Sequence, residues 1–230
     1  MSTKTANQVY IGMHYRSIDK MSKEYMLDTQ FGKVYNNIQF SSRFDFTTRH
    51  PLSLKFIASY ATTDYYNMKY IFSQENSMSL NQEREAFAKL KISLPFLLRK
   101  KAEIGIGVAE ITDRYMPSSI IDLDNPQFDK NKMRLAGASI KFQGNTLDNN
   151  AFPTEGSYEK LSAEFYVGKE KYKSGNFSIK DRESKSWLQV NYIRNEVFKI
   201  SRHFSLAAYL HIYYSTRALS HTYQASLMQA

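Results

Sequence analysis

The sequence predicts an all-β protein, an antiparallel up-and-down transmembrane β-barrel, of which this chain forms a part with about 10 to 12 strands. Three observations support this fold class. Apolar and polar residues alternate with a period of two along many segments, as in strands with one apolar face. Aromatic residues make up 14% of the chain, and their rings suit a pleated sheet. Short connections also alternate with longer polar ones, as in up-and-down barrels.

The alternation is clearest in residues 38–46, IQFSSRFDF, where the apolar side chains occupy even positions. A helix would bring residues three and four apart onto one side, so a period of two favours strands. The same pattern recurs at residues 52–59, 88–96, 102–108, 160–167, 188–192 and 204–212. Residues 17–37 alternate poorly, and the sequence leaves them as either a short helix or an irregular strand.

The connections between these segments predict two different ends of the sheet. Short connections are expected at residues 47–51, 97–101 and 194–201. Longer polar ones are expected at residues 117–132 and 169–186. In membrane barrels the short turns face the periplasm and the long loops face the exterior.

Alternation alone fits two kinds of protein. In a soluble β-sandwich or lipocalin-like binding module the apolar side chains point into a core, whereas in a membrane barrel they face lipid. The polar side chains here are often Ser, Gly, Gln, Asn and Tyr with single charges, which is typical of a wet lumen. Residues 85–97 and 203–215 also reach the roughly 9 to 11 residues that a membrane-crossing strand needs. We therefore predict the membrane barrel and keep the soluble module as the alternative.

Aromatic residues near the segment ends suit the two girdles that membrane barrels place at the lipid–water interfaces, although aromatics that pack in a core would look the same. These residues are Tyr65, Tyr66, Tyr70, Phe72, Tyr115, Tyr172, Trp187, Tyr213 and Tyr214.

The charge balance indicates an anionic partner. The chain has 31 Lys and Arg against 22 Asp and Glu, a formal charge of +9, and such a surplus attracts phosphate groups. Six basic residues are expected in one exterior loop, where they would contact lipopolysaccharide or form an ordinary charged loop. They are Lys169, Lys171, Lys173, Lys180, Arg182 and Lys185. The other basic residues are spread over all segments without a nucleic-acid-binding motif, so no nucleic acid is expected as a partner.

The stretch Asn145–Ser157, NTLDNNAFPTEGS, predicts a stiff turn between two strands, because Pro153 fixes φ and Gly156 relieves the backbone. It resembles the turn motif of the BamA/TamA-type barrels, the bacterial surface-antigen family of outer-membrane translocators. The residues that match the motif are Asp148, Asn149, Phe152, Pro153, Thr154 and Gly156. The wider sequence is similar to the barrel that follows patatin-like phospholipase domains, from VYIGMHYRS to the ending SHTYQASLMQA.

The resemblance implies a translocator or anchor barrel in the outer membrane of a Gram-negative bacterium, with outer-membrane lipid and lipopolysaccharide as partners. That family's barrel has sixteen strands and an Arg-Gly-aromatic motif that is missing here. Residues 1–230 are therefore expected to form one barrel domain that is incomplete at both ends, and to pair with a second copy or with the rest of their own barrel. We expect no polypeptide-transport-associated repeat and no patatin domain within the chain.

Catalytic and metal chemistry find little support in the sequence. The Gly-x-Ser-x-Gly motif of lipases does not occur, there is no Cys, and no cofactor or enzymatic activity is predicted. A patatin-like lipase domain elsewhere in a longer protein remains compatible with this prediction. Asp122, Asp124, Asn125 and Asp129 lack the spacing of a calcium-binding loop and are expected to be solvated. No run of about 18 apolar residues could form a membrane-spanning helix.

Overall fold

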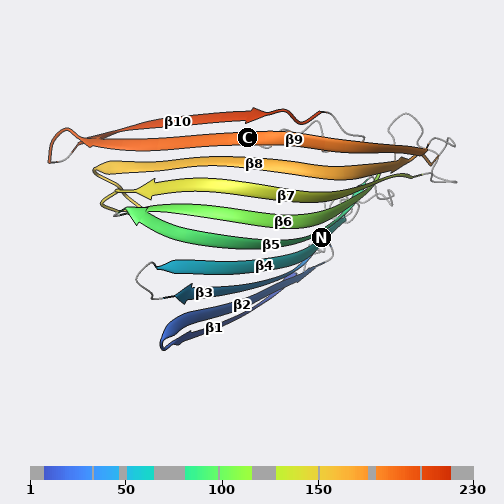
Figure 1. Ribbon diagram of the computed structural model, residues 1–230, viewed down its shortest axis with the longest axis horizontal. Coiled ribbons are helices and arrows are strands. Elements are labelled where there is room, and N and C mark those ends of the chain that lie inside the picture. Colours follow the sequence, from blue (N-terminus) through green and yellow to red (C-terminus); the bar gives the residue numbers. More distant parts are fainter. Residues whose placement is uncertain are drawn as a thin grey trace, which may run out of the picture.

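The structure is a computed structural model that describes residues 8–32, 34–46, 51–64, 81–97, 99–115, 128–149, 151–175, 180–202 and 204–218. Within these residues it contains ten antiparallel strands, and each strand pairs with its neighbours in sequence (Figure 1). The all-β, up-and-down fold is confirmed, with a strand number at the lower end of the expected range. None of the described residues forms a helix of the length and hydropathy that membrane crossing requires.

The strands are β1 Gln8–Ile18, β2 Met21–Gly32, β3 Tyr35–Phe46, β4 Leu52–Asp64, β5 Asn81–Leu97, β6 Lys100–Tyr115, β7 Asp129–Asn145, β8 Gly156–Lys173, β9 Lys180–Lys199 and β10 Ser205–Ser215. Residues 17–37, which the sequence left open, contain the whole of β2, a regular strand that pairs with both β1 and β3. The expected short connections at residues 47–51 and 97–101 are confirmed by the strand ends.

Two expected connections are wrong, and the one expected at residues 117–132 was placed too far along the chain, because β7 already begins at Asp129. Residues 169–186 were expected to form a long loop, but strand β8 continues to Lys173 and β9 begins at Lys180. The two strands pair without a break from Gly156 opposite Val197 to Lys173 opposite Lys180. Residues 194–199 likewise belong to β9 and not to a turn. Charged residues continue these strands because backbone pairing does not require apolar side chains.

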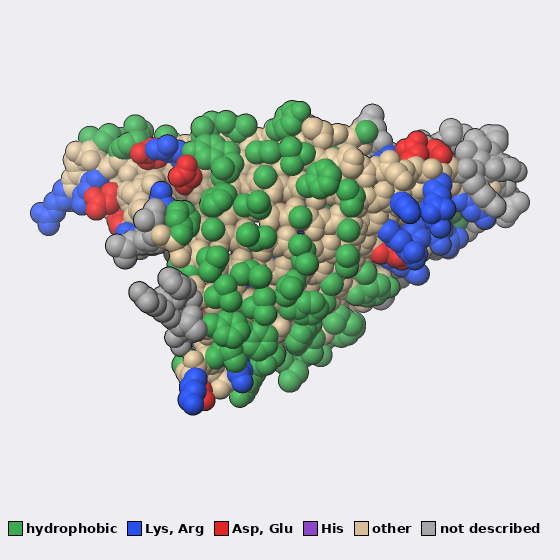
Figure 2. All heavy atoms as spheres, in the orientation of Figure 1, with side chains coloured by type: hydrophobic (Ala, Val, Ile, Leu, Met, Phe, Trp, Pro, Cys, Tyr) green, Lys and Arg blue, Asp and Glu red, His purple; other side chains and the backbone are tan. Residues whose placement is uncertain are grey.

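The sheet has two chemically distinct faces. The outer face carries apolar side chains in the middle of the strands, and many of them are exposed, among them Ile106 and Phe165 (Figure 2). The inner face carries polar and small residues, and there Asn131 and Glu170 are almost completely buried. At Gly137 the Tyr166 ring lies so close that a Cβ atom would be 2.6 Å from it, which explains the glycine.

The aromatic girdle was predicted wrongly at four positions, one of which is Tyr213, whose register partner Asn191 faces inward. Trp187 lies on the inner face and stacks on Tyr166 with 5.1 Å between ring centroids. Tyr115 and Tyr172 point to the same inner face, where the Tyr172 hydroxyl donates to Asp129. Aromatic side chains therefore pack along the inner wall as well as the outer surface. Tyr65, Tyr66, Tyr70 and Phe72 lie outside the described residues.

The sheet has two free edges. Among the described residues, β1 pairs only with β2 and β10 pairs only with β9. The backbone donors and acceptors along the outer sides of β1 and β10 are thus left without a neighbouring strand.

Candidate functional site

An apolar band crosses the outer face of β6 to β9 between two polar rows. One row aligns Lys100, Gly144, Glu159 and Arg194 on the four successive strands. The other row lies ten positions away on each strand, toward the end that carries the β8–β9 connection. It aligns Glu110, Arg134, Lys169 and Ser184. Between the rows, nearly every outward residue is apolar.

The width of this band matches a membrane. Ten residues of a strand extend about 33 Å, which becomes about 25 Å across the bilayer when a strand is tilted by roughly 40°. Outward side chains inside the band are well exposed: Ile106 is 61% exposed and Val108 is 58% exposed. An exposed surface of this size and continuity marks an interaction with lipid or protein.

The inner face carries a network of ion pairs and hydrogen bonds. Lys91 on β5 lies 3.1 Å from a carboxylate oxygen of Glu103 on β6. Further along, the Asn131 side chain donates to Glu170 at 2.7 Å, and Lys185 pairs with the same carboxylate. Buried charges need such partners. The inner wall is therefore polar, as in a water-filled barrel.

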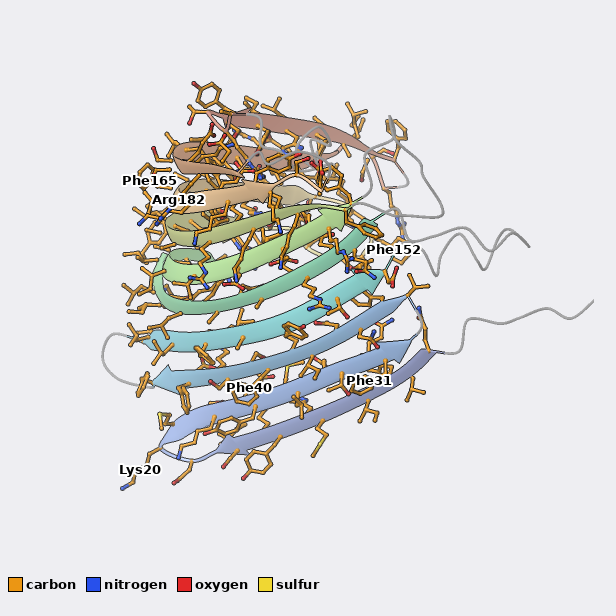
Figure 3. The ribbon with its side chains drawn as sticks, turned by 90° about the vertical axis from the view of Figure 1, so that its right-hand side faces the viewer. Lys20, Phe31, Phe40, Phe152, Phe165 and Arg182 are labelled. Atoms are coloured by element: carbon orange, nitrogen blue, oxygen red, sulfur yellow. The ribbon has the colours of Figure 1, made fainter. Side chains whose placement is uncertain are left out.

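The end of the sheet that carries the β8–β9 connection has a cluster of basic residues on its outer face. We call this cluster the basic belt; it consists of Lys132, Arg134, Lys169, Lys171, Lys173 and Arg182. It lies at the end of the apolar band, where Figure 2 shows Lys and Arg side chains gathered on the right of the molecule. Figure 3 shows Arg182 and Phe165 projecting from the same side of the sheet.

The six basic residues predicted for a lipopolysaccharide-contacting loop are placed on two strands instead of a loop. Lys169, Lys171 and Lys173 of β8 face outward, as does Arg182 of β9. Lys180 is paired in register with Lys173. Lys185 lies on the inner face, so it was wrongly included in an exterior surface.

Two belt residues, Lys132 and Arg134 on β7, were missed from the sequence. They share the even-numbered positions of Ala136, Ala138 and Ile140, which face outward. Extending the alternation of this strand toward its beginning would have found them.

The stretch Asn145–Ser157, which we call the motif turn, connects β7 to β8. It is closed by the Asp148 carboxylate. This carboxylate accepts hydrogen bonds from the Thr154 backbone N–H at 2.9 Å, the Thr154 hydroxyl at 2.5 Å and the Glu155 N–H at 3.2 Å. Asn149 caps the next residues, since its side-chain oxygen accepts from the backbone of Ala151 and Phe152. Phe152 itself is 81% exposed.

Hydrogen bonds from the Thr154 side chain and backbone and from the Glu155 backbone hold the pKa of Asp148 well below its usual range. A carboxyl group with a lowered pKa in the folded state stabilises that state above its ordinary pKa. The contribution is lost only as the pH falls through the lowered value. The turn therefore stays closed at neutral and mildly acidic pH.

Of the four residues considered for calcium, only Asp129 belongs to the part of the chain that the structure describes. Asp129 begins β7, and its carboxylate accepts from the Tyr172 hydroxyl and the Gly175 backbone. Asp122, Asp124 and Asn125 lie outside the described residues. Within the described ranges, no three acidic, His or Cys side chains come together as metal ligands.

These features define a class of fold, a curved meander with an apolar outside and a polar inside. No family model matches the sequence, and no curated protein sequence matches it. Among solved structures, the crystal structure of BamA from Haemophilus ducreyi lacking POTRA domains 1-3 is similar, with a TM-score of 0.60 and 13% sequence identity. The match covers 92% of this chain and 41% of that chain.

At this identity the likeness concerns the fold. The ten-stranded sheet has the fold of part of a BamA-like β-barrel, which confirms that part of the predicted resemblance. The chain spans about two fifths of the length of the BamA chain that it matches. The similarity to TamA and to barrels that follow patatin-like phospholipase domains stays a prediction.

Proposed function

We propose that this chain is a membrane-embedded part of a BamA-like β-barrel in the outer membrane of a Gram-negative bacterium. The observation that carries the proposal is the apolar band on the outer face, bounded by two polar rows. The inner face below that band has ion pairs such as Lys91 with Glu103. A membrane barrel needs this arrangement of apolar outside and polar inside.

The soluble alternative would need the opposite arrangement. In a sandwich or lipocalin-like module the apolar side chains cover one another, yet Ile104, Ile140 and Phe165 are each about half exposed on the outer face. Most of the buried residues, among them Asn131 and Glu170, lie on the polar side of the sheet. This distribution favours lipid as the surrounding medium.

The orientation follows from the two ends of the strands. The short connections join β1 to β2, β5 to β6 and β9 to β10 at one end. The connections after β4 and β6 are longer and lie at the other end. In outer-membrane barrels the longer loops face the exterior, so we place the basic belt in the outer leaflet.

The role that we propose is anchoring or export of a polypeptide, without catalysis by this chain. It rests on the resemblance of the motif turn and the wider sequence to surface-antigen barrels that follow patatin-like phospholipases. The free edges of β1 and β10 support a further partner, because hydrocarbon cannot satisfy their backbone groups. That partner is the rest of the same barrel or a second copy of the chain.

The proposed membrane position is tested with two single-cysteine variants, Ile140→Cys and Lys141→Cys. The chain has no native Cys, so each variant carries one fluorescent label. Ile140 faces outward in the middle of the band, and Lys141 is its inward-facing neighbour on β7. After refolding into phospholipid vesicles, we expect nitroxide-labelled lipid to quench the label at position 140 and aqueous iodide to quench the label at position 141.

The two neighbouring positions serve as controls for each other, since they lie at the same depth. Quenching of both labels by iodide, or failure of the chain to enter vesicles, would contradict the membrane position. Attachment to a patatin-like domain is tested separately by reading the coding DNA on both sides of this frame.

A further inference from the structure

The basic belt brings like charges directly opposite one another on the outer face. Arg134 of β7 is paired in register with Lys169 of β8, and Lys132 is paired with Lys171. Lys171 is also opposite Arg182 of β9. Side chains in such pairs have Cβ atoms about 5 Å apart, and like charges there are destabilising.

One carboxylate offsets part of this repulsion. Glu110 of β6 lies 2.7 Å from Lys132 and 2.7 Å from Arg134. No carboxylate among the described residues forms an ion pair with Lys169, Lys171, Lys173 or Arg182. Four of the six residues of the basic belt are therefore left with uncompensated positive charge.

The charge lies at a defined depth. Lys169 follows Val167, the last outward apolar residue of β8, by two positions, which is about 7 Å along the strand. A groove of about 780 Å³ lies over the belt and is lined by Lys132, Arg134, Lys169, Lys171 and Arg182 among others. This position corresponds to the headgroup level just above the hydrocarbon.

At the opposite end of the same strands, carboxylates accompany the basic residues of the outer surface. Arg194 pairs with Glu196 at 2.7 Å, and Glu159 accepts from the Tyr192 hydroxyl. Exposed basic residues such as Lys100, Lys199 and Arg202 are present there as well. Register pairs of two basic residues, as Arg134 with Lys169 and Lys171 with Arg182, occur in these strands at the end with the longer loops.

We propose that the basic belt binds the phosphate groups of lipid A in the outer leaflet. This inference rests on the proposed membrane position and identifies the lipid that the outer surface binds. Lys and Arg side chains are the usual ligands of phosphate, and Arg can contact two phosphate oxygens at once. A lipid with two phosphates on one headgroup matches a belt that spans three strands, and its acyl chains would lie against the apolar band.

The proposal is tested with the variant K169Q/K171Q/R182Q of the full chain in neutral detergent. Binding of bisphosphorylated lipid A is measured by native mass spectrometry at several salt concentrations. We expect the three changes to weaken binding by roughly fivefold per charge, or about a hundredfold together. We also expect the variant to be more stable than the parent chain when no lipid A is present, because the cross-strand repulsion has been relieved.

The matched control is K100Q/K199Q/R202Q, which removes the same charge from exposed positions at the other end of the strands. It should bind lipid A like the parent chain. Lipid A whose phosphates have been removed, phosphatidylglycerol and inorganic phosphate serve as comparison ligands. Equal loss in both triple variants, or equally tight binding of any comparison ligand, would overturn the assignment to lipid A.

The result can be separated from a failure of the proposed function. If the labels at positions 140 and 141 are quenched as expected and lipid A still does not bind, only the lipid A assignment is wrong. If the label at position 140 is not reached by lipid, the membrane position itself is wrong.

Discussion

Gly156 is the residue of the motif turn at which no other side chain fits. Its φ is 105°, a left-handed conformation that favours glycine. A Cβ atom built there would lie 2.4 Å from the carbonyl oxygen of Thr146, which is backbone and cannot rotate away. The turn thus places β8 against β7 only because this position lacks a side chain.

We predict that Gly156→Ala lowers the free energy of unfolding by about 1–3 kcal/mol, since the strained φ and the steric clash act together. The matched control is Gly144→Ala, twelve positions earlier at the end of β7, where a Cβ would meet only the flexible Lys100 side chain at 3.4 Å. Urea unfolding in detergent measures both. Equal stability of the two variants would show that the turn is not held in this conformation.

At the residue scale the sequence predicted where the turn lies but not how Asp148 closes it. Pro153 and Gly156 restrict the backbone locally, and such effects can be read from a short window. The hydrogen bonds to Asp148 require Thr154 and Glu155 to fold back onto it, which depends on the pairing of β7 with β8. The face on which Lys185 lies also depends on that kind of cross-strand register.

Strands are the elements that the sequence predicts best, because the period of two acts along each strand. It predicted the apolar faces of β3 to β6 and of β8 to β10. It did not predict where β8 and β9 end, because polar composition was taken as a sign of a loop. In these two strands the backbone pairing continues past the apolar band to Lys173 and Lys180.

The apolar band predicts that the two faces of a single strand differ in how well they tolerate a charge. Leu188 and Gln189 are neighbours on β9 that face outward and inward respectively. We expect Leu188→Lys to lower stability in phospholipid vesicles by about 2–4 kcal/mol, because a charge would then face hydrocarbon. Gln189→Lys would lie opposite Glu164 on the polar wall and should cost little.

Reversible denaturant titration in vesicles measures the difference between these two lysine variants. A larger loss for Gln189→Lys than for Leu188→Lys would mean that the faces have been assigned the wrong way round.

For the whole molecule, the sequence could indicate the number of strands but not the closure of the sheet. Closure depends on strand tilt and shear over the full ring, and no local pattern contains this information. The structure shows that β1 and β10 remain unpaired with each other in the described residues. Ten is an even number, so β1 and β10 are antiparallel, and β10 of one copy can join β1 of another without breaking the alternation.

We therefore predict that the isolated chain does not remain a monomer of 26.8 kDa in detergent, because each free edge leaves backbone groups unsatisfied in an apolar medium. Light scattering of the refolded chain measures its mass.

The double variant M13C/L210C tests the proposed junction, since Met13 and Leu210 are the central residues of β1 and β10. A short bis-maleimide should link two copies of the double variant efficiently, and each single variant only weakly. A stable, monodisperse monomer would mean that the chain satisfies its edges in another way, and efficient linking of the M13C variant alone would indicate that two β1 strands meet instead.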